Sequence, residues 1–581
     1  MRSPYTFSRA LVAERTWPFV LDLTVAAGLL GGFYAILWIA KFWFSGAIPE
    51  VEIYRSPSHL PLYAFYSTVR IFVAYLLSLA FAVGYGYIAA YNPRVEALMI
   101  ATLDILQSIP VLSFLPGVML AMMSLFPSRQ LGIELGAILL IFTGEVWNMA
   151  FSFYSSLKSI PRELHEACQI NRFSALQRLF QLELPYATIG LVWNSMVSVA
   201  SGWFFLMVCE MFPVGSRNFR LPGLGSYLQT AASNGDYQAM TWGLIAMMLI
   251  VVLTDQLLWR PLIAWSDKFK FENVESADRI TSPILHLIRN SNMLALVQRR
   301  AIAPLNERIY RTVALRNERQ AEQAKRQKPS SRRNVAISLV VGVVAAAAVG
   351  LAAVHALLLL RQVHGHDLMQ LLVGAAATFL RVNVSLLLAS AWAIPVGVII
   401  GFHPRLANIT QPLAQIAASF PATAFFPVIL VLLIRLGLGL NIGSIALMML
   451  GTQWYILFNV IAGAMAIPSD LKEVSDLFHF SNLQCWTTVI LPGIFPFLIT
   501  GLVTASGGAW NASIVAEYFQ LKNHTLTTTG LGEQISKASE QGNFPMLLAA
   551  TIIMALMVVT INRLVWRPLY RLAETKYKLE G

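Results

Sequence analysis

Two arginines and two glutamates lie within long apolar stretches, where ionisable side chains are costly and therefore often functional. Arg70 and Arg381 lie about two turns into one kind of stretch, and Glu210 and Glu517 lie near the end of another. In a dry pathway, guanidinium groups would compensate the charge of an anionic solute. Alternatively, each arginine forms a structural ion pair with a glutamate or anchors its helix at the membrane surface. The predicted pathway residues also include two tryptophans, Trp203 and Trp510.

Two short polar stretches begin with Ile-Pro and continue with acidic residues, at Ile160–Cys168 and Ile467–Ser475. Proline is favoured in the first turn of a helix and acids suit its N-terminus, so each stretch is expected to begin a short helix. Small or apolar residues at i, i+3 and i+4 form one face, with the acids beside it. Such a face suits docking into a groove of another protein. The residues predicted to dock are Glu163, Glu166, Ala167, Cys168, Asp470, Glu473, Val474 and Ser475.

A helix lying on the membrane surface is the alternative for these stretches. Surface helices of that kind usually carry many Lys and Arg on the polar face. The acidic edge of both stretches argues against it.

Motifs for catalysis and cofactor binding do not occur in the sequence. There is no G-x-x-x-x-G-K-[ST] phosphate loop, and no Gly-Lys pair at all. H-E-x-x-H, paired-cysteine zinc spacing and G-x-S-x-G do not occur either. We therefore expect no catalytic, cofactor or metal residues and no enzymatic activity in this chain.

The composition indicates that the surrounding elements are membrane-spanning helices. Of the 581 residues, 56% are hydrophobic and only 12% are charged, against about 25% charged in soluble chains. Three cysteines exclude a disulfide scaffold. Twelve apolar runs approach the ~20 residues of a spanning helix, which predicts an all-α polytopic membrane protein. They lie near Pro18–Phe44, Leu62–Tyr91, Val95–Phe126, Gly132–Tyr154, Tyr186–Phe212, Met240–Leu262, Val335–Leu360, Leu371–Phe402, Leu406–Leu436, Asn441–Met465, Gly493–Tyr518 and Pro545–Leu569.

The basic charge is concentrated between the two sets of runs. From Asp267 to Arg333, 15 Lys and Arg stand against 7 Asp and Glu, so this segment carries +8 of the net +12. It lacks the interleaved aromatics of a nucleic-acid surface, so no nucleic-acid partner is expected. The positive-inside rule predicts that it is a cytoplasmic linker, with attraction to anionic lipid as a minor addition. Six crossings from an N-terminus with Arg2, Arg9 and Arg15 give the same orientation, with both chain ends cytoplasmic.

The chain is a tandem duplication. Trp259-Arg260-Pro261-Leu262 recurs 307 residues later as Trp566-Arg567-Pro568-Leu569, and upstream of the fourth run the offset is 311. Because each half has an even number of crossings, the halves have the same orientation and would pack about an axis along the membrane normal. A pathway between them is the natural function, with a duplicated scaffold as the alternative. Further pairs are Arg70/Arg381, Trp147/Trp454, Glu166/Glu473, Trp203/Trp510, Glu210/Glu517 and Gly223-Leu224-Gly225/Gly530-Leu531-Gly532.

The two acidic stretches resemble the coupling-helix motif of ABC importer permeases. That motif runs from Glu-Ala-Ala through Gly to Leu-Pro, and Glu166–Pro185 and Glu473–Pro492 both fill its twenty-residue frame. The Gly-Leu-Gly turns and the basic end of the last run are similar to the nitrate/sulfonate/taurine-type branch. The motif glycine is replaced by Arg172 and His479, which puts the local turn geometry in question.

The resemblance implies a fused permease of two type I units, in residues 1–266 and 335–581, joined by a linker in residues 267–334. It implies a bacterial inner-membrane importer of a small anion or small polar organic molecule. Two cytoplasmic ATPase subunits, which bind ATP and Mg²⁺, would dock on the segments 160–185 and 467–492, and an extracytoplasmic binding protein would deliver the solute. An ion-coupled secondary transporter and a membrane scaffold without transport are the alternatives.

Overall fold

The computed structural model describes most of both halves of the chain. The described residues are 51–126, 129–171, 173–214, 217–269, 343, 347, 350–351, 353–521 and 524–576. The predicted first span Pro18–Phe44 and nearly all of the linker lie outside them. Only part of the predicted span Val335–Leu360 lies within them.

Long apolar helices account for most of the described part of the first half. The α-helices are α2 (Leu60–Tyr91), α3 (Pro93–Ser108), α4 (Leu115–Leu125), α5 (Arg129–Lys158), α6 (Arg162–Ile170), α7 (Ala175–Arg178), α8 (Leu184–Cys209), α9 (Leu224–Asn234), α10 (Tyr237–Thr254) and α11 (Arg260–Ser266). Short 3₁₀ turns are η1 (Pro57–His59), η2 (Val111–Phe114) and η5 (Asp267–Phe269), and π-helical turns are η3 (Leu179–Glu183) and η4 (Asp255–Trp259). Strands β1 (Met211–Val214) and β2 (Arg217–Arg220) form an antiparallel hairpin.

The second half repeats this order. Its α-helices are α16 (Gly365–Phe402), α17 (Pro404–Ser419), α18 (Ala422–Arg435), α19 (Leu440–Ala466), α20 (Ser469–Leu477), α21 (Asn482–Cys485), α22 (Leu491–Ala516), α23 (Leu531–Gln541), α24 (Phe544–Ile561) and α25 (Arg567–Lys576). The π-helical turns are η7 (Trp486–Ile490) and η8 (Asn562–Trp566), and β3 (Tyr518–Leu521) pairs with β4 (His524–Thr527). The all-α polytopic class is confirmed, with a small hairpin added in each half.

Eight helices in the described part of the chain are long and apolar enough to cross a membrane. They correspond to eight of the twelve predicted spans. The predicted spans Val95–Phe126 and Leu406–Leu436 are each divided between two helices. In the first half α3 and α4 are bent by 83° relative to each other, and in the second half the shorter α17 and α18 replace the span.

A proline causes the same break in both halves. Ile109 and Phe420 have extended backbones, with ψ of 131° and 126°, because each precedes a proline, Pro110 or Pro421. The extended residue ends the first helix, and a new helical segment begins after the proline. Hydropathy alone does not distinguish such a pair from a continuous span.

The broken pair α3–α4 still crosses the bundle. At one end, Glu96 of α3 lies beside the end of α5, where its carboxylate is 2.7 Å from Lys158 Nζ. At the other end, Gly132 near the start of α5 lies against Met122 and Met123 of α4. The two short helices therefore connect opposite ends of α5, as one spanning helix would.

Glycines allow the central helices of each half to approach closely. A Cβ on Gly86 of α2 would meet Phe153 of α5 at 2.8 Å, and one on Gly397 of α16 would meet Val460 of α19 at 2.8 Å. These are equivalent contacts in the repeat, since Phe153 and Val460 are 307 residues apart. Small residues at helix interfaces are typical of membrane bundles, where close backbone packing replaces the hydrophobic effect.

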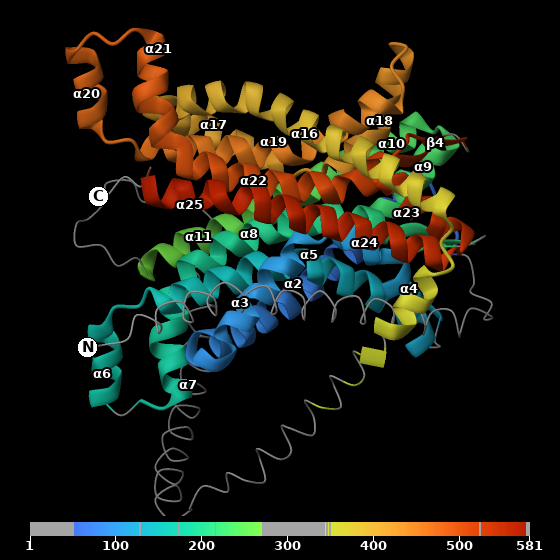
Figure 1. Ribbon diagram of the computed structural model, residues 1–581, viewed down its shortest axis with the longest axis horizontal. Helices are drawn as coiled ribbons and strands as arrows, with labels where there is room; N and C mark the ends of the chain where they lie inside the picture. The colour runs from blue at the N-terminus through green and yellow to red at the C-terminus, as the bar shows by residue number, and fades with distance from the viewer. Residues whose placement is uncertain are drawn as a thin grey trace, which may run out of the picture.

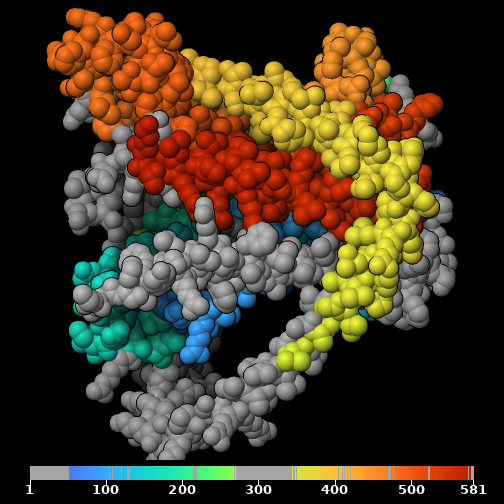
Figure 2. Space-filling model, in the orientation of Figure 1, coloured from blue at the N-terminus to red at the C-terminus, as the bar shows by residue number. Residues whose placement is uncertain are grey.

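The two halves pack through reciprocal contacts, as expected for a pseudo-two-fold axis. Helix α9 contacts β3 while α23 contacts β1, and α10 contacts α17 while α24 contacts α3. Figure 1 shows α6 and α20 at one end of the bundle, and α9, α23 and β4 at the opposite end. We call these the coupling end and the hairpin end. In the space-filling view the α20–α21 segment, in orange, projects from the body at the coupling end (Figure 2).

Candidate functional site

Arg70 is buried in a network of ion pairs at the hairpin end of the first half. Its Nη1 donates to Glu210 at 2.6 Å, and its Nε and Nη2 donate to the two carboxylate oxygens of Glu134 at 2.5 and 2.7 Å. Glu210 is fully buried and also accepts from Ser67 Oγ at 2.6 Å and from the Gly225 backbone N–H at 2.7 Å. The donors around this buried carboxylate thus come from two elements other than its own helix: Ser67 and Arg70 from α2, and Gly225 from the Gly-Leu-Gly turn.

The second half repeats the network with fewer charges. Arg381 Nη1 donates to Glu517 at 3.0 Å and to the Thr529 carbonyl at 2.6 Å. Glu517 accepts from Thr378 Oγ1 at 2.9 Å and from the Gly532 N–H at 2.8 Å. Asn441, the repeat equivalent of Glu134, accepts from Arg381 at 3.4 Å. The sequence reasoning missed Glu134 and Asn441, although both are polar residues at equivalent positions of the repeat.

The Gly-Leu-Gly turns close over these carboxylates. A Cβ on Gly223 would collide with the Glu210 carboxylate, and one on Gly530 would collide with the Glu517 carboxylate. Each glutamate therefore joins its spanning helix to the helix that follows the hairpin. In this conformation the two arginines are engaged in these structural pairs, and their role in the pathway stays a prediction.

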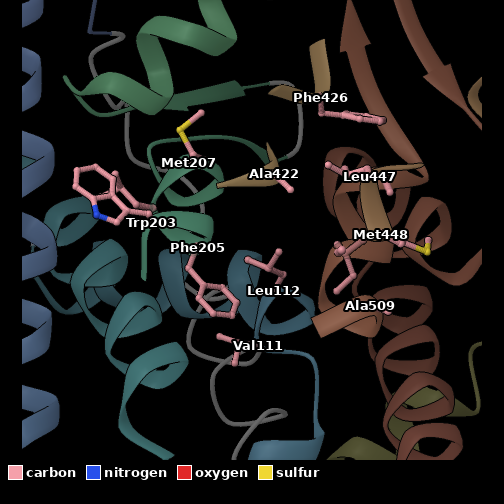
Figure 3. Close-up of a cluster of buried hydrophobic side chains, with 14 of the residues drawn as sticks. Val111, Leu112, Trp203, Phe205, Met207, Ala422, Phe426, Leu447, Met448 and Ala509 are labelled. Atoms are coloured by element: carbon pink, nitrogen blue, oxygen red, sulfur yellow. The ribbon is translucent and has the colours of Figure 1, made fainter. Parts of the chain in front are cut away.

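The two predicted tryptophans are buried in the protein. Trp203 is 3% exposed and lines a cavity of about 320 Å³ that lies within the first half, between α2, α8 and the α10–η4 helix. Figure 3 shows its ring directed away from Leu112 and Ala422, which lie between the halves. Trp510 is 1% exposed. In this conformation no contact supports the prediction that these two tryptophans line the path, so it stays a prediction.

A cavity of about 130 Å³ lies between the halves near the hairpin end. Its walls come from η2, α4, α8, β1 and α9 of the first half and from α18, α22, β3 and α23 of the second. None of the residues predicted from the sequence lines it. Equivalent residues of the two halves that face the pseudo-two-fold axis would have predicted this cavity. A sequence alone does not show which face of a helix points to the axis.

The two acidic stretches form the predicted short helices, α6 and α20, at the coupling end. Glu163, Glu166 and Ala167 are exposed on α6, while Cys168 is buried against its own chain. Burial raises the pKa of the Cys168 thiol, which favours its protonated form.

On α20, Glu473 and Val474 are exposed and Ser475 is buried. Leu477 and Phe478 at its end are 76% and 68% exposed. The exposed part of each helix thus combines an acid with small or apolar side chains. Asp470 lies on α20 as well.

The turn that follows α20 takes the conformation that the missing motif glycine would favour. His479 has φ of +49°, in the left-handed region that L-residues rarely adopt. The Phe480 N–H donates to the Ser475 carbonyl at 3.0 Å, and the equivalent Phe173 N–H donates to Cys168 at 2.9 Å. The two halves therefore close the helix in the same way.

The first coupling segment is fixed to α2 by a polar cluster. Glu183 of η3 accepts from Arg178 Nε at 2.6 Å and from Tyr91 Oη at 2.6 Å. The Arg178 guanidinium lies 4.3 Å from the centre of the Tyr91 ring. The equivalent residues in the second half are all uncharged: Ile490, Cys485 and Phe402.

The first half also contains a buried carboxylate without a partner. Glu145 of α5 is fully buried, and neither of its oxygens forms a hydrogen bond within the described structure. It lies against Gly202 of α8. The repeat equivalents are Thr452 and Ala509, so the larger side chain faces the glycine and the smaller one faces the alanine.

Comparisons with known proteins agree with this duplicated architecture. Residues 82–258 and 393–567 each match the family described as "Binding-protein-dependent transport system inner membrane component". A putative ABC transporter permease protein of Methanocaldococcus jannaschii is 28% identical over 183 residues, which is 32% of this chain and 65% of that protein.

Two further relatives show similar coverage. A nitrate import permease protein of Leptolyngbya laminosa is 27% identical over 190 residues, 33% of this chain and 64% of that protein. A taurine transport system permease protein of Escherichia coli is 26% identical over 187 residues, 32% of this chain and 64% of that protein. The chain thus spans just under two thirds of the length of these curated relatives.

Proposed function

Since this chain belongs to the family of binding-protein-dependent transport system inner membrane components, we propose that it is the complete permease of an ATP-driven importer, with both halves in one chain. The observation that carries this proposal is the double family match, combined with two equivalent acidic helices at one end of the bundle (Figure 1). The solute path would lie between the halves. In a permease of two separate chains, the second side of this path would belong to another chain, whereas here one chain would supply both sides.

Separate ATPase subunits would supply the energy, because the chain has no phosphate loop. ATP and Mg²⁺ would bind to those two subunits. Each would receive one short helix: Glu163, Glu166 and Ala167 on α6, and Asp470, Glu473 and Val474 on α20. Cys168 and Ser475, which are buried, would support these helices from behind. The coupling end and both chain ends would be cytoplasmic, in the inner membrane of a bacterium.

The hairpin end would face the extracytoplasmic binding protein that delivers the solute. The most extensive contacts between the halves, among the described elements, join η2 to α22, α18 to α8, α9 to β3, and α23 to β1. These elements lie toward the hairpin end, so the path would be closed on that side in this conformation. ATP binding would draw the coupling segments together and open the hairpin end.

The nature of the solute is suggested by the relatives, whose names include nitrate and taurine. We propose a small anion or a small polar organic molecule. The buried Arg70 and Arg381 would act on an anion only if transport broke their pairs with Glu210 and Glu517.

ATP-dependent uptake tests the proposal. The chain would be expressed with candidate ATPase and binding-protein chains of its own organism, purified through a tag on the chain and reconstituted into liposomes. We expect two ATPase copies to copurify and solute to accumulate only with ATP. Accumulation driven by an ion gradient without ATP would instead identify a secondary transporter, and copurification without any accumulation would identify a scaffold.

A further inference from the structure

The cavity between the halves lies on the pseudo-two-fold axis. Five pairs of equivalent residues, each 307 residues apart, line it together: Met207/Ile514, Val208/Val515, Met211/Tyr518, Phe212/Phe519 and Gln229/Ser536. Leu112 and Thr423, which are related by the upstream offset of 311, form a sixth pair. Only a cavity that the axis passes through is lined by both members of so many pairs. A solute that moves between the halves would therefore meet this cavity.

The two walls of the cavity differ in chemistry, although they are equivalent in position. The first-half wall consists of apolar side chains apart from Gln229, among them Leu112, Leu115, Met207 and Met211. Figure 3 shows two of these wall residues, Leu112 and Met207, and beside them Ala422 of the second half, the neighbour of the wall residue Thr423.

The second-half wall carries most of the neutral polar groups. They are the hydroxyls of Thr423, Ser536 and Ser539 and the amide of Gln520. Tyr518 adds its ring, while its hydroxyl donates to Glu540. No Asp, Glu, Lys, Arg or His is among the described residues that line the cavity.

One of these polar groups has no partner. Thr423 is 6% exposed, and its Oγ1 forms no hydrogen bond with any described residue. A buried hydroxyl without a partner costs free energy, so it indicates a ligand or water at that position. Because Thr423 lines the cavity, that partner would be inside it.

We infer that this cavity is a binding site for a short amphipathic organic solute, with its polar head on the second-half wall and its apolar body on the first-half wall. The inference rests on the proposed function and refines the solute class within it. A bare inorganic anion would leave half of its surface against Leu112, Leu115 and the methionines, which supply no donors. A solute with an apolar body avoids that cost.

The cavity has room for a small organic solute. Its volume of about 130 Å³ is several times the ~10–15 Å³ that a cavity needs to hold a single water molecule. Ethanesulfonate and propionamide are suitable probes with a charged and a neutral head. Nitrate is the probe without an apolar body.

Direct binding to the assembled complex in lipid nanodiscs without ATP tests the inference. Thermal unfolding would be followed with a thiol-reactive dye in a Cys485→Ser background, because Cys485 is half-buried, whereas Cys209 is fully buried and becomes reactive only when the chain unfolds. Ligands that bind the folded state raise the unfolding temperature. We expect ethanesulfonate or propionamide to raise it in a saturable way, and nitrate at the same concentration to have no effect.

Two substitutions locate the bound head group. Thr423→Val and Ser536→Ala each remove one hydroxyl of the second-half wall, and each should weaken binding about five- to tenfold, the effect of one lost hydrogen bond. Thr551→Val is the matched control, because this buried hydroxyl donates to the Leu547 carbonyl of its own helix, away from the cavity. It should leave binding of the probe unchanged.

The inference is overturned if nitrate binds as well as the two organic probes, if neither organic probe binds, or if Thr423→Val and Ser536→Ala bind like the parent. Such results, obtained on a complex that still imports its solute with ATP, would leave the proposed function intact. Failure of the ATPases to copurify, or of ATP to drive uptake, would refute the proposed function instead. The binding result on the chain alone would then still decide whether the cavity takes an amphipathic solute.

Discussion

At the scale of single residues, the two arginine–glutamate networks are the most consequential feature of the molecule. Both alternatives for these residues were visible in the sequence, because charged residues that repeat inside apolar helices either serve a path or pair with each other. The structure favours pairing in this conformation, since Glu210 and Glu517 are fully buried and Arg70 is 3% exposed. The sequence does not show this directly, because pairing depends on which helix faces are in contact.

Replacing Arg70 with Gln should destabilise the protein by about 3–5 kcal/mol, because it leaves the carboxylate of Glu210 buried without its cation. Thermal unfolding of the purified chain measures this. The double substitution Arg70→Gln/Glu210→Gln should recover part of the loss, since it removes the fully buried carboxylate and leaves only Glu134, which is 27% exposed, without its cation. If Arg70→Gln and Arg381→Gln instead assemble and unfold like the parent but fail to import an anion, the arginines serve the path. If both variants match the parent in uptake and in stability, the arginines neither serve the path nor stabilise the protein.

Gly202→Ala should destabilise the protein by about 1–3 kcal/mol, because the added methyl overlaps the Glu145 carboxylate. Glu145→Thr/Gly202→Ala should restore stability. This double variant introduces into the first half the combination that the second half has in Thr452 and Ala509. Unfolding temperatures of the two variants and the parent provide the comparison. Equal stability of Gly202→Ala and the parent would show that the Glu145 carboxylate moves aside without cost.

At the scale of elements, the turn after α20 shows how the repeat tolerates the loss of a motif glycine. His479→Gly should stabilise the protein by about 1 kcal/mol, because a left-handed conformation costs an L-residue roughly 1–2 kcal/mol. His403→Gly is the matched control, since this histidine also follows a helix but has φ of −118°. The unfolding temperature should rise for the first variant and not for the second. A decrease with His479→Gly would indicate that the imidazole makes a contact worth more than the strain.

The elements that were predicted correctly and those that were not differ in a physical way. Eight spans were predicted because a continuous apolar helix has a composition that hydropathy detects. Hydropathy missed the breaks before Pro110 and Pro421 because the residues on both sides remain apolar. The two prolines were the available signal, since the residue before a proline favours an extended backbone and so indicates a helix boundary. The short helices α6 and α20 were predicted from their prolines and acids, which act locally.

At the scale of the whole molecule, the coupling end carries two equivalent short helices, α6 and α20. The segment after α6 is anchored by the polar cluster around Glu183, whereas the equivalent residues after α20 are uncharged. If the proposed coupling is right, Glu166→Lys and Glu473→Lys should each reduce ATP-driven uptake at least tenfold while leaving membrane insertion intact, because a cation would replace the acid that is proposed to face the ATPase groove. Copurified ATPase and the uptake rate are the measurements. Glu52→Lys, an exposed acid at the hairpin end, should behave like the parent. Normal uptake by the double variant Glu166→Lys/Glu473→Lys would remove these helices from the coupling mechanism.

The duplication also has a consequence for how such a protein changes over generations. In a permease of two identical chains, every mutation near the axis appears twice, so a residue that improves one wall of the central cavity alters the opposite wall as well. In this chain, position 423 can become threonine while position 112 remains leucine. A single mutation therefore explores one wall at a time, and selection can fit the two walls to the two ends of an asymmetric cargo.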